Sequence, residues 1–196
     1  YQQMMRDTEK MVTGVAKGLE LGSMIEYQGR KIDLRLPWPR LTVREAFLKN
    51  AGWDPVTEHD PLRFDTDLVM KVIPAFPPDR PTVLTDYPAA MASLARIKPG
   101  DSTIAERAEV FIGGLELANA YSELTDAAEQ ARRFHEAIEQ IAKERGRTMP
   151  VPDRFLEAVP HLPECGGIAL GFDRLVMLFC NAASIDEVIP FTVDTV

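Results

Sequence analysis

The sequence lacks the features that mark several large protein classes. Only two of its 196 residues are cysteines, Cys165 and Cys180, and their spacing suits neither a disulfide framework nor a metal site. The three histidines, His59, His135 and His161, form no HxxxH or HExxH pattern, so zinc chemistry is not expected. There is no apolar run long enough to span a membrane and no secretory signal. We therefore expect reduced thiols, no membrane association and a cytoplasmic protein.

Basic residues are also in the minority. The chain has 22 Lys and Arg against 30 Asp and Glu, which gives a formal net charge of −8. An acidic surface is a poor electrostatic footprint for broad nucleic-acid binding. We therefore expect either that an RNA partner is held mainly by segments outside this chain or that the macromolecular partner is not RNA. Because the first residue is Tyr1 rather than Met, we expect the chain to be a piece of a longer protein.

The sequence does contain amphipathic helices mixed with short strands. This mixture, without a regular alternation of strand and helix, predicts an α+β fold in which an antiparallel β-sheet is flanked by helices. Residues 68–73 are apolar and fit either a helix or a strand. Helices are expected at residues 1–21, 46–50 after a capping box at 42–45, 126–145, 154–159 and 173–183, and strands at 25–27, 30–34, 82–86, 104–123 and 166–170.

Two glutamates flank a predicted hairpin turn. Gly113-Gly114 between apolar runs is a two-residue turn signal. Such a turn would place Phe111 opposite Glu116 and Glu109 opposite Ala118, with the two glutamates diagonal on one face. Carboxylates this close repel unless a cation or a proton lies between them, and Mg²⁺ binds carboxylates together with substrate phosphates. The alternative is a solvated edge hairpin with two exposed glutamates.

The next strand carries a polar, aromatic and acidic stripe. Alternation puts Asn119, Tyr121 and Glu123 on one face. A carboxylate, a ring and an amide suit a cationic side chain such as that of lysine, although a polar solvent-facing surface would read the same way. Strict alternation puts Glu116 on the opposite face, so a shared pocket requires a β-bulge near Ala118.

A glycine-rich strand then leads into a helix with an arginine at its start. Asp173 is expected to be the N-cap, and Arg174 projects from the first turn. A helix N-terminus with a guanidinium suits an anion. The segment is neither a Walker A motif nor GxGxxG. A glycine-rich turn with a surface salt bridge is the alternative interpretation.

Together, these blocks resemble the class II aminoacyl-tRNA synthetases of the lysyl type. Residues 109–123 are similar to the family's metal-binding and lysine-binding block, and residues 167–178 to its third motif. Residues 1–16 resemble the helix after the second motif, and residues 85–88 its TDxP turn. The resemblance implies that residues 1–196 are the C-terminal portion of a class II synthetase-like catalytic domain without motifs 1 and 2.

The resemblance also implies a role for each motif residue. ATP and Mg²⁺ would be required, and the amino-acid carboxylate would attack the α-phosphate to give a lysyl- or β-lysyl-adenylate. Because motif 2 is absent, the isolated chain is expected to be inactive. The implied positions are Glu109 and Glu116 for the metal and ATP, Gly171 and Arg174 for ATP with Arg174 also catalytic, and Asn119, Tyr121, Glu123 and Ala169 for the amino acid.

Two alanines indicate a branch of this family. Lysyl-tRNA synthetases usually have glycine where this chain has Ala118 and Ala169, and the motifs ELANAYSEL and GIALGFDRL more closely resemble the elongation factor P–(R)-β-lysine ligases. A methyl group at Ala169 could discriminate between α- and β-amino isomers by about 1–3 kcal/mol. The resemblance thus implies a ligase that passes lysine or β-lysine to a lysine of elongation factor P. The alternatives are a fragment of a lysyl-tRNA synthetase acting on tRNA(Lys) and a non-catalytic regulatory paralogue. The full-length protein is expected to be a homodimer.

Overall fold

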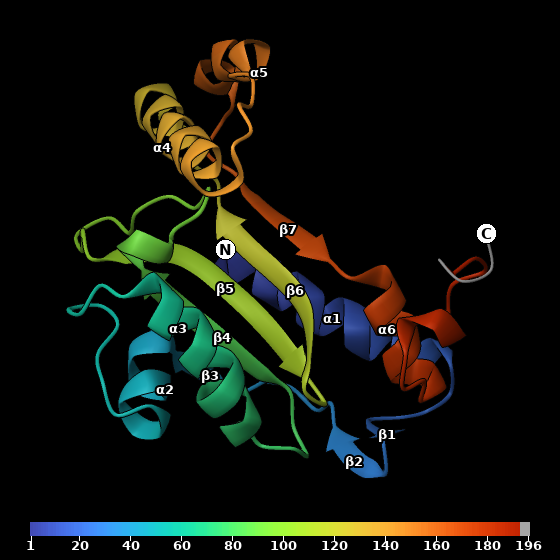
Figure 1. The fold of residues 1–196 in the computed structure, drawn as a ribbon. Coiled ribbons are helices and arrows are strands. Elements are labelled where there is room, and N and C mark those ends of the chain that lie inside the picture. The colour runs from blue at the N-terminus through green and yellow to red at the C-terminus, as the bar shows by residue number, and fades with distance from the viewer. Residues whose placement is uncertain (193–196) are drawn as a thin grey trace.

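A five-stranded sheet forms the centre of the molecule, whose computed structural model describes residues 1–192. Its strand order is β3-β4-β5-β6-β7, and the hairpin of β1 and β2 lies at one end (Figure 1). All neighbouring strands are antiparallel except β3 and β4. The predicted α+β fold is confirmed, although the short β3 and its parallel pairing were not anticipated. The strands are β1 Met24–Tyr27, β2 Arg30–Asp33, β3 Arg40–Thr42, β4 Thr82–Pro88, β5 Ile104–Ile112, β6 Leu115–Ser122 and β7 Gly166–Leu170.

The helices lie at different positions around this sheet. The helix α1 crosses behind β6, α2 and α3 lie beside β3 and β4, and α4 and α5 extend past one end of the strands (Figure 1). No helix within residues 1–192 combines the length and apolarity needed to cross a bilayer. The helices are α1 Gln2–Gly18, α2 Val43–Asn50, α3 Pro61–Asp67, α4 Ala127–Arg145, α5 Asp153–Ala158 and α6 Phe172–Cys180.

Local sequence signals explain where two of the helices begin and end. At α2 the predicted capping box is confirmed, because the Glu45 backbone N–H donates to Thr42 Oγ1 and the Thr42 N–H donates to the Glu45 carboxylate. At α4 the Asp126 carboxylate accepts from two backbone N–H groups of the first turn, and Gly146 ends the helix with a φ of 61°. Residues 68–72, which fitted either element, form a π-helical turn.

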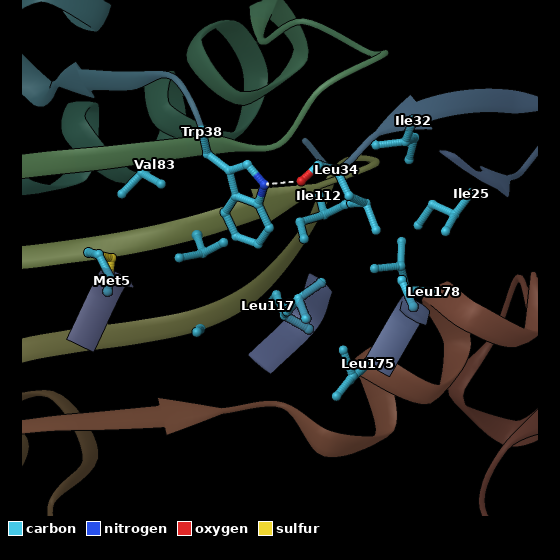
Figure 2. Packing of buried hydrophobic residues seen from close by; sticks show 14 of the residues in the cluster. Met5, Ile25, Ile32, Leu34, Trp38, Val83, Ile112, Leu117, Leu175 and Leu178 are labelled. Atoms are coloured by element: carbon cyan, nitrogen blue, oxygen red, sulfur yellow. Dashed lines mark hydrogen bonds between the residues drawn. The ribbon is translucent and has the colours of Figure 1, made fainter. Parts of the chain in front are cut away.

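One face of the sheet is packed against α1. Met5, Val12 and Ala16 are fully buried there in one cluster with the strand side chains. Trp38 lies within this cluster, and its indole N–H donates to the Leu34 carbonyl oxygen at 3.0 Å (Figure 2). We call this the core face, defined on β5 and β6 by Ala108, Val110, Leu117, Ala118 and Ala120.

The opposite face is covered only in part. A second cluster rich in aromatic residues covers its β3 and β4 side, where the Phe47 and Phe64 rings stack at 4.7 Å and Phe111 from β5 joins them. In Figure 1 no helix lies in front of β5 and β6 beyond that cluster. We call the uncovered part the open face, defined by Arg107, Glu109, Glu116, Asn119, Tyr121 and Glu123.

Candidate active site

The hairpin between β5 and β6 turns where the sequence predicted. Gly113 and Gly114 have φ values of 62° and 89°, which suits glycine, and Ile112 pairs with Leu115 across the turn. A Cβ on Gly113 would also lie 2.7 Å from the Tyr27 ring, so this position has no room for a side chain.

A β-bulge at Leu117 corrects the expected register. Phe111 pairs with Glu116 as predicted, but Val110 pairs with Ala118, so Leu117 is the extra residue on β6. Glu109 therefore faces Asn119, and its predicted pairing with Ala118 was wrong. The physical reason is burial: Leu117 and Ala118 are 1% and 2% exposed, and both enter the core face.

The bulge decides which side chains share the open face. Because two consecutive residues point into the core, the alternation of β6 shifts by one after Glu116. Glu116 thereby lies on the same face as Asn119, Tyr121 and Glu123. A shared pocket required a β-bulge near Ala118, and the structure has one at the adjacent residue, Leu117.

Glu109 is almost fully buried and is held by two donors. The residue is 5% exposed, and its Oε1 accepts from Arg107 Nη2 at 2.6 Å and from Asn119 Nδ2 at 3.2 Å. Arg107 was not identified from the sequence. It lies two residues before Glu109 on the same strand, so alternation would have placed it on this face. Burial of an ionised carboxylate requires such partners.

Glu116 is more open and lies beside Arg174. Burial raises the pKa of the Glu116 carboxyl, and the neighbouring Glu109 carboxylate raises it further. Arg174 Nη1 donates to the Glu116 backbone oxygen at 2.6 Å and lies 3.8 Å from its carboxylate Oε2. The guanidinium at the start of α6 is thus fixed next to Glu116, one of the two predicted metal-binding glutamates.

The start of α6 differs from the prediction in its cap. Gly171, not Asp173, is the N-cap, and Asp173 lies in the first turn without a capping bond from its side chain. The reason is that β7 runs directly into the helix, with the Gly171 N–H donating to the Leu117 carbonyl oxygen at 2.9 Å. A Cβ on Gly171 would lie 3.3 Å from Arg174, so this glycine packs closely beside the arginine.

Small residues of β7 line up beside the polar stripe of β6. Ala169 pairs with Asn119, and Gly167 pairs with Tyr121. A Cβ on Gly167 would lie 1.9 Å from Glu123 Oε1, which shows that the Glu123 carboxylate lies directly over this glycine. Burial raises the pKa of the Glu123 carboxyl. A cation at this end would favour the ionised carboxylate, which burial alone disfavours.

The donor set fits Mg²⁺ accompanied by phosphate groups. Within the described residues no group of three or more His, Cys, Asp or Glu side chains could hold a metal by itself. Mg²⁺ commonly binds one or two protein carboxylates and takes its other oxygens from substrate phosphates and water. Glu109 and Glu116 supply two carboxylates, and Arg174 supplies a guanidinium for phosphate oxygens.

The structure gathers the predicted site residues on one surface. Glu109, Glu116 and Arg174 cluster at one end, and Tyr121 and Glu123 lie at the other. Two cavities of the molecule lie elsewhere. One of about 510 Å³ lies beyond the glycine turn and one of about 600 Å³ lies beside α4, and neither is lined by these site residues.

The chain is similar in sequence to one family of known proteins. Residues 1–195 match the family described as tRNA synthetases class II (D, K and N). A lysine–tRNA ligase of Dehalococcoides mccartyi is 38% identical over 212 residues, which cover 97% of this chain and 43% of that protein. One from Moorella thermoacetica is 35% identical over 212 residues, with the same two coverages of 97% and 43%.

A second kind of relative matches a shorter stretch at higher identity. An elongation factor P–(R)-β-lysine ligase of Klebsiella pneumoniae is 48% identical over 126 residues, which cover 64% of this chain and 39% of that protein. The chain therefore spans less than half the length of these curated relatives. The match over residues 1–195, together with these identities, shows that the chain belongs to the class II tRNA synthetase family of the D, K and N type.

Proposed function

We propose that the protein containing this chain activates lysine or (R)-β-lysine with ATP and transfers it to a lysine of elongation factor P. The β-bulge at Leu117 carries this proposal, because it brings Glu116 onto the face of Asn119, Tyr121 and Glu123. A strand rises about 3.3 Å per residue, so Glu116 and Glu123 are roughly 20 Å apart along β6. That span accommodates an extended amino acid followed by nucleotide phosphates.

The Glu123 end has the chemistry for an ammonium group. Its carboxylate would pair with the ε-ammonium, and the Tyr121 ring would add a cation–π contact. Asn119 Oδ1 is buried and accepts no hydrogen bond from any described residue, whereas its Nδ2 is engaged by Glu109. A buried acceptor of this kind is costly unless a donor reaches it, and an amino group of the substrate is such a donor.

The Glu116 end has the chemistry for metal-bound phosphate. Glu109 and Glu116 would hold Mg²⁺. The bound ion would neutralise negative charge on the phosphates. Arg174 is anchored through one guanidinium nitrogen to the Glu116 backbone, which leaves its other nitrogens for phosphate oxygens. Gly171 keeps the backbone beside this arginine free of a side chain.

Activation of the amino acid requires these residues only to position the substrates and to stabilise charge. A carboxylate oxygen of the amino acid forms a bond to the α-phosphorus, the bond to the β-phosphate oxygen breaks, and pyrophosphate leaves. Glu123, Tyr121 and Asn119 would fix the amino acid, and Arg174 would stabilise charge on the phosphates. No covalent bond to the protein is needed.

The choice of acceptor rests on small residues and on local identity. Ala118 and Ala169 occupy positions where the lysyl-tRNA synthetases usually have glycine, and Ala169 pairs with Asn119 in the amino-acid region. The 48% identity to the Klebsiella pneumoniae protein over 126 residues supports the elongation factor P reading. The 38% identity over 97% of the chain supports the alternative, a lysine–tRNA ligase.

The experiment is amino-acid activation by the full-length protein. ATP–pyrophosphate exchange is measured with α-lysine and with (R)-β-lysine, followed by transfer to tRNA(Lys) and to elongation factor P. We expect exchange with (R)-β-lysine above α-lysine and transfer to the protein acceptor. Transfer to tRNA(Lys) alone would establish the synthetase instead, and the absence of both exchange and Mg–ATP binding by calorimetry would favour a regulatory paralogue.

A further inference from the structure

Arg107, the arginine of the open face, contacts several neighbouring residues. Its side chain is 17% exposed, and its Nη1 donates to the Met91 carbonyl oxygen at 2.8 Å. The guanidinium carbon lies 4.4 Å from the centre of the Tyr87 ring and 5.7 Å from that of Tyr121. Its Nη2 binds Glu109 at 2.6 Å. One side chain thus contacts three strands and the loop after β4.

The contact with Glu109 fixes one oxygen of a buried carboxylate. Arg107 and Asn119 both donate to Oε1, so a cation would approach Glu109 from Oε2. Arg107 therefore fixes the orientation of the Glu109 carboxylate, with Oε2 left as the oxygen that faces a ligand.

The contact with Tyr121 reaches the other half of the open face. Arg107 and Tyr121 are cross-strand partners of β5 and β6, and the guanidinium lies between the two tyrosine rings. Tyr121 is the ring that the amino-acid side chain would meet. The orientation of this ring and that of the Glu109 carboxylate are thus set by the same guanidinium.

We propose that Arg107 is a positioning residue that orients Glu109 for Mg²⁺–nucleotide binding and holds Tyr121 in the wall of the amino-acid pocket. This inference rests on the proposed function for the identity of the two ligands. Arg107 touches neither ligand. It acts through the carboxylate and the ring, in the way that residues behind a metal ligand set the ligand's orientation.

The test separates metal binding from turnover. Mg²⁺ is titrated calorimetrically into the full-length protein saturated with a non-hydrolysable ATP analogue, for wild type, Arg107→Met and Arg107→Lys. We expect Arg107→Met to weaken Mg²⁺ binding roughly 10–100-fold, as is usual when a residue behind a metal ligand is removed. Arg107→Lys keeps the charge but not the planar fork, so partial recovery is expected. In lysine-dependent exchange the KM for lysine should rise together with that for Mg–ATP.

Arg40→Met provides a matched control. Arg40 pairs at 3.3 Å with Glu9, another buried glutamate, but on the α1 side of the sheet. Its loss should lower stability without changing Mg²⁺ affinity. Unchanged Mg²⁺ affinity in both Arg107 variants would overturn the inference, as would an equal loss in the Arg40 control. Failure of wild type to exchange with either lysine isomer would sink the proposed function alone, since Mg²⁺–nucleotide binding is measured without turnover.

Discussion

The two faces of β5 and β6 hold their side chains in place by different means. On the core face, the apolar side chains of β5 and β6 pack against those of α1. On the open face, Glu109 is fixed by an ion pair and an amide, and Glu123 lies over a glycine. The pKa of Glu116 and that of Glu123 are both raised by burial, so ionised carboxylates are kept where they cost stability. Stability and binding should therefore be separable by face.

Removing a side chain from the core face should have the largest effect on stability. Met5 is fully buried between α1 and the strands (Figure 2). Met5→Ala is expected to cost about 2–5 kcal/mol of unfolding free energy, because it leaves a cavity in the core. Chemical denaturation of the longer protein measures this loss. Below the melting temperature, the KM for lysine should not change, and a changed KM would mean that the two faces are coupled.

The reverse is expected for Glu123→Gln on the open face. Loss of a charge-assisted hydrogen bond to the ammonium should cost about 1.5–3 kcal/mol, or roughly 10–100-fold in kcat/KM for lysine. Because the folded-state pKa of Glu123 is raised, its ionised form destabilises the folded protein at neutral pH, so the variant should be as stable as wild type or more stable. Glu26→Gln, at an exposed position on β1, is the control that should leave both quantities unchanged.

A substitution on β7 sharpens this result without touching the carboxylate itself. In Gly167→Ala the new methyl would overlap Glu123 Oε1, so the carboxylate must rotate away. We expect an activity loss of about 10-fold, since one charged contact is displaced rather than deleted. The double variant with Glu123→Gln should be little worse than Glu123→Gln alone, because both changes remove the same contact. Additive losses in exchange assays would show that Gly167 acts elsewhere.

Local signals sufficed for many of the elements, although not for β3 or α3. The glycine turn, the capping box at Thr42 and the αL glycine that ends α4 depend on residues adjacent in sequence, and the structure contains all three. The β-bulge could not be derived in this way. Leu117 and Ala118 read as an ordinary strand, and only packing against α1 draws both inward.

Arg107 escaped prediction for a similar reason. Nothing in the neighbouring residues indicates that Tyr87, which is distant in sequence, stacks on its guanidinium. The cap at α6 was misplaced because the hydrogen bond of Gly171 to Leu117 comes from another strand. Motif resemblance nevertheless singled out Glu109, Glu116 and Asn119, which the structure brings onto one face, because family motifs carry tertiary information that local propensity lacks.

The smallest expected effect is a contrast in pH dependence between Asp33 on β2 and Glu123 on the open face. Beside the core cluster, hydrogen bonds from Arg35 lower the pKa of Asp33 to about 2, so its contribution to stability is present above pH 4 and is lost as the pH falls towards 2. For Glu123 the pKa is raised, so stability should increase as the pH falls from neutral and the group is protonated. Asp33→Asn should remove part of the loss of stability towards pH 2. Glu123→Gln should remove part of the gain in stability as the pH falls from neutral. Denaturation midpoints between pH 2 and 7 measure both effects, and identical profiles for the two variants would contradict the opposite pKa shifts of Asp33 and Glu123.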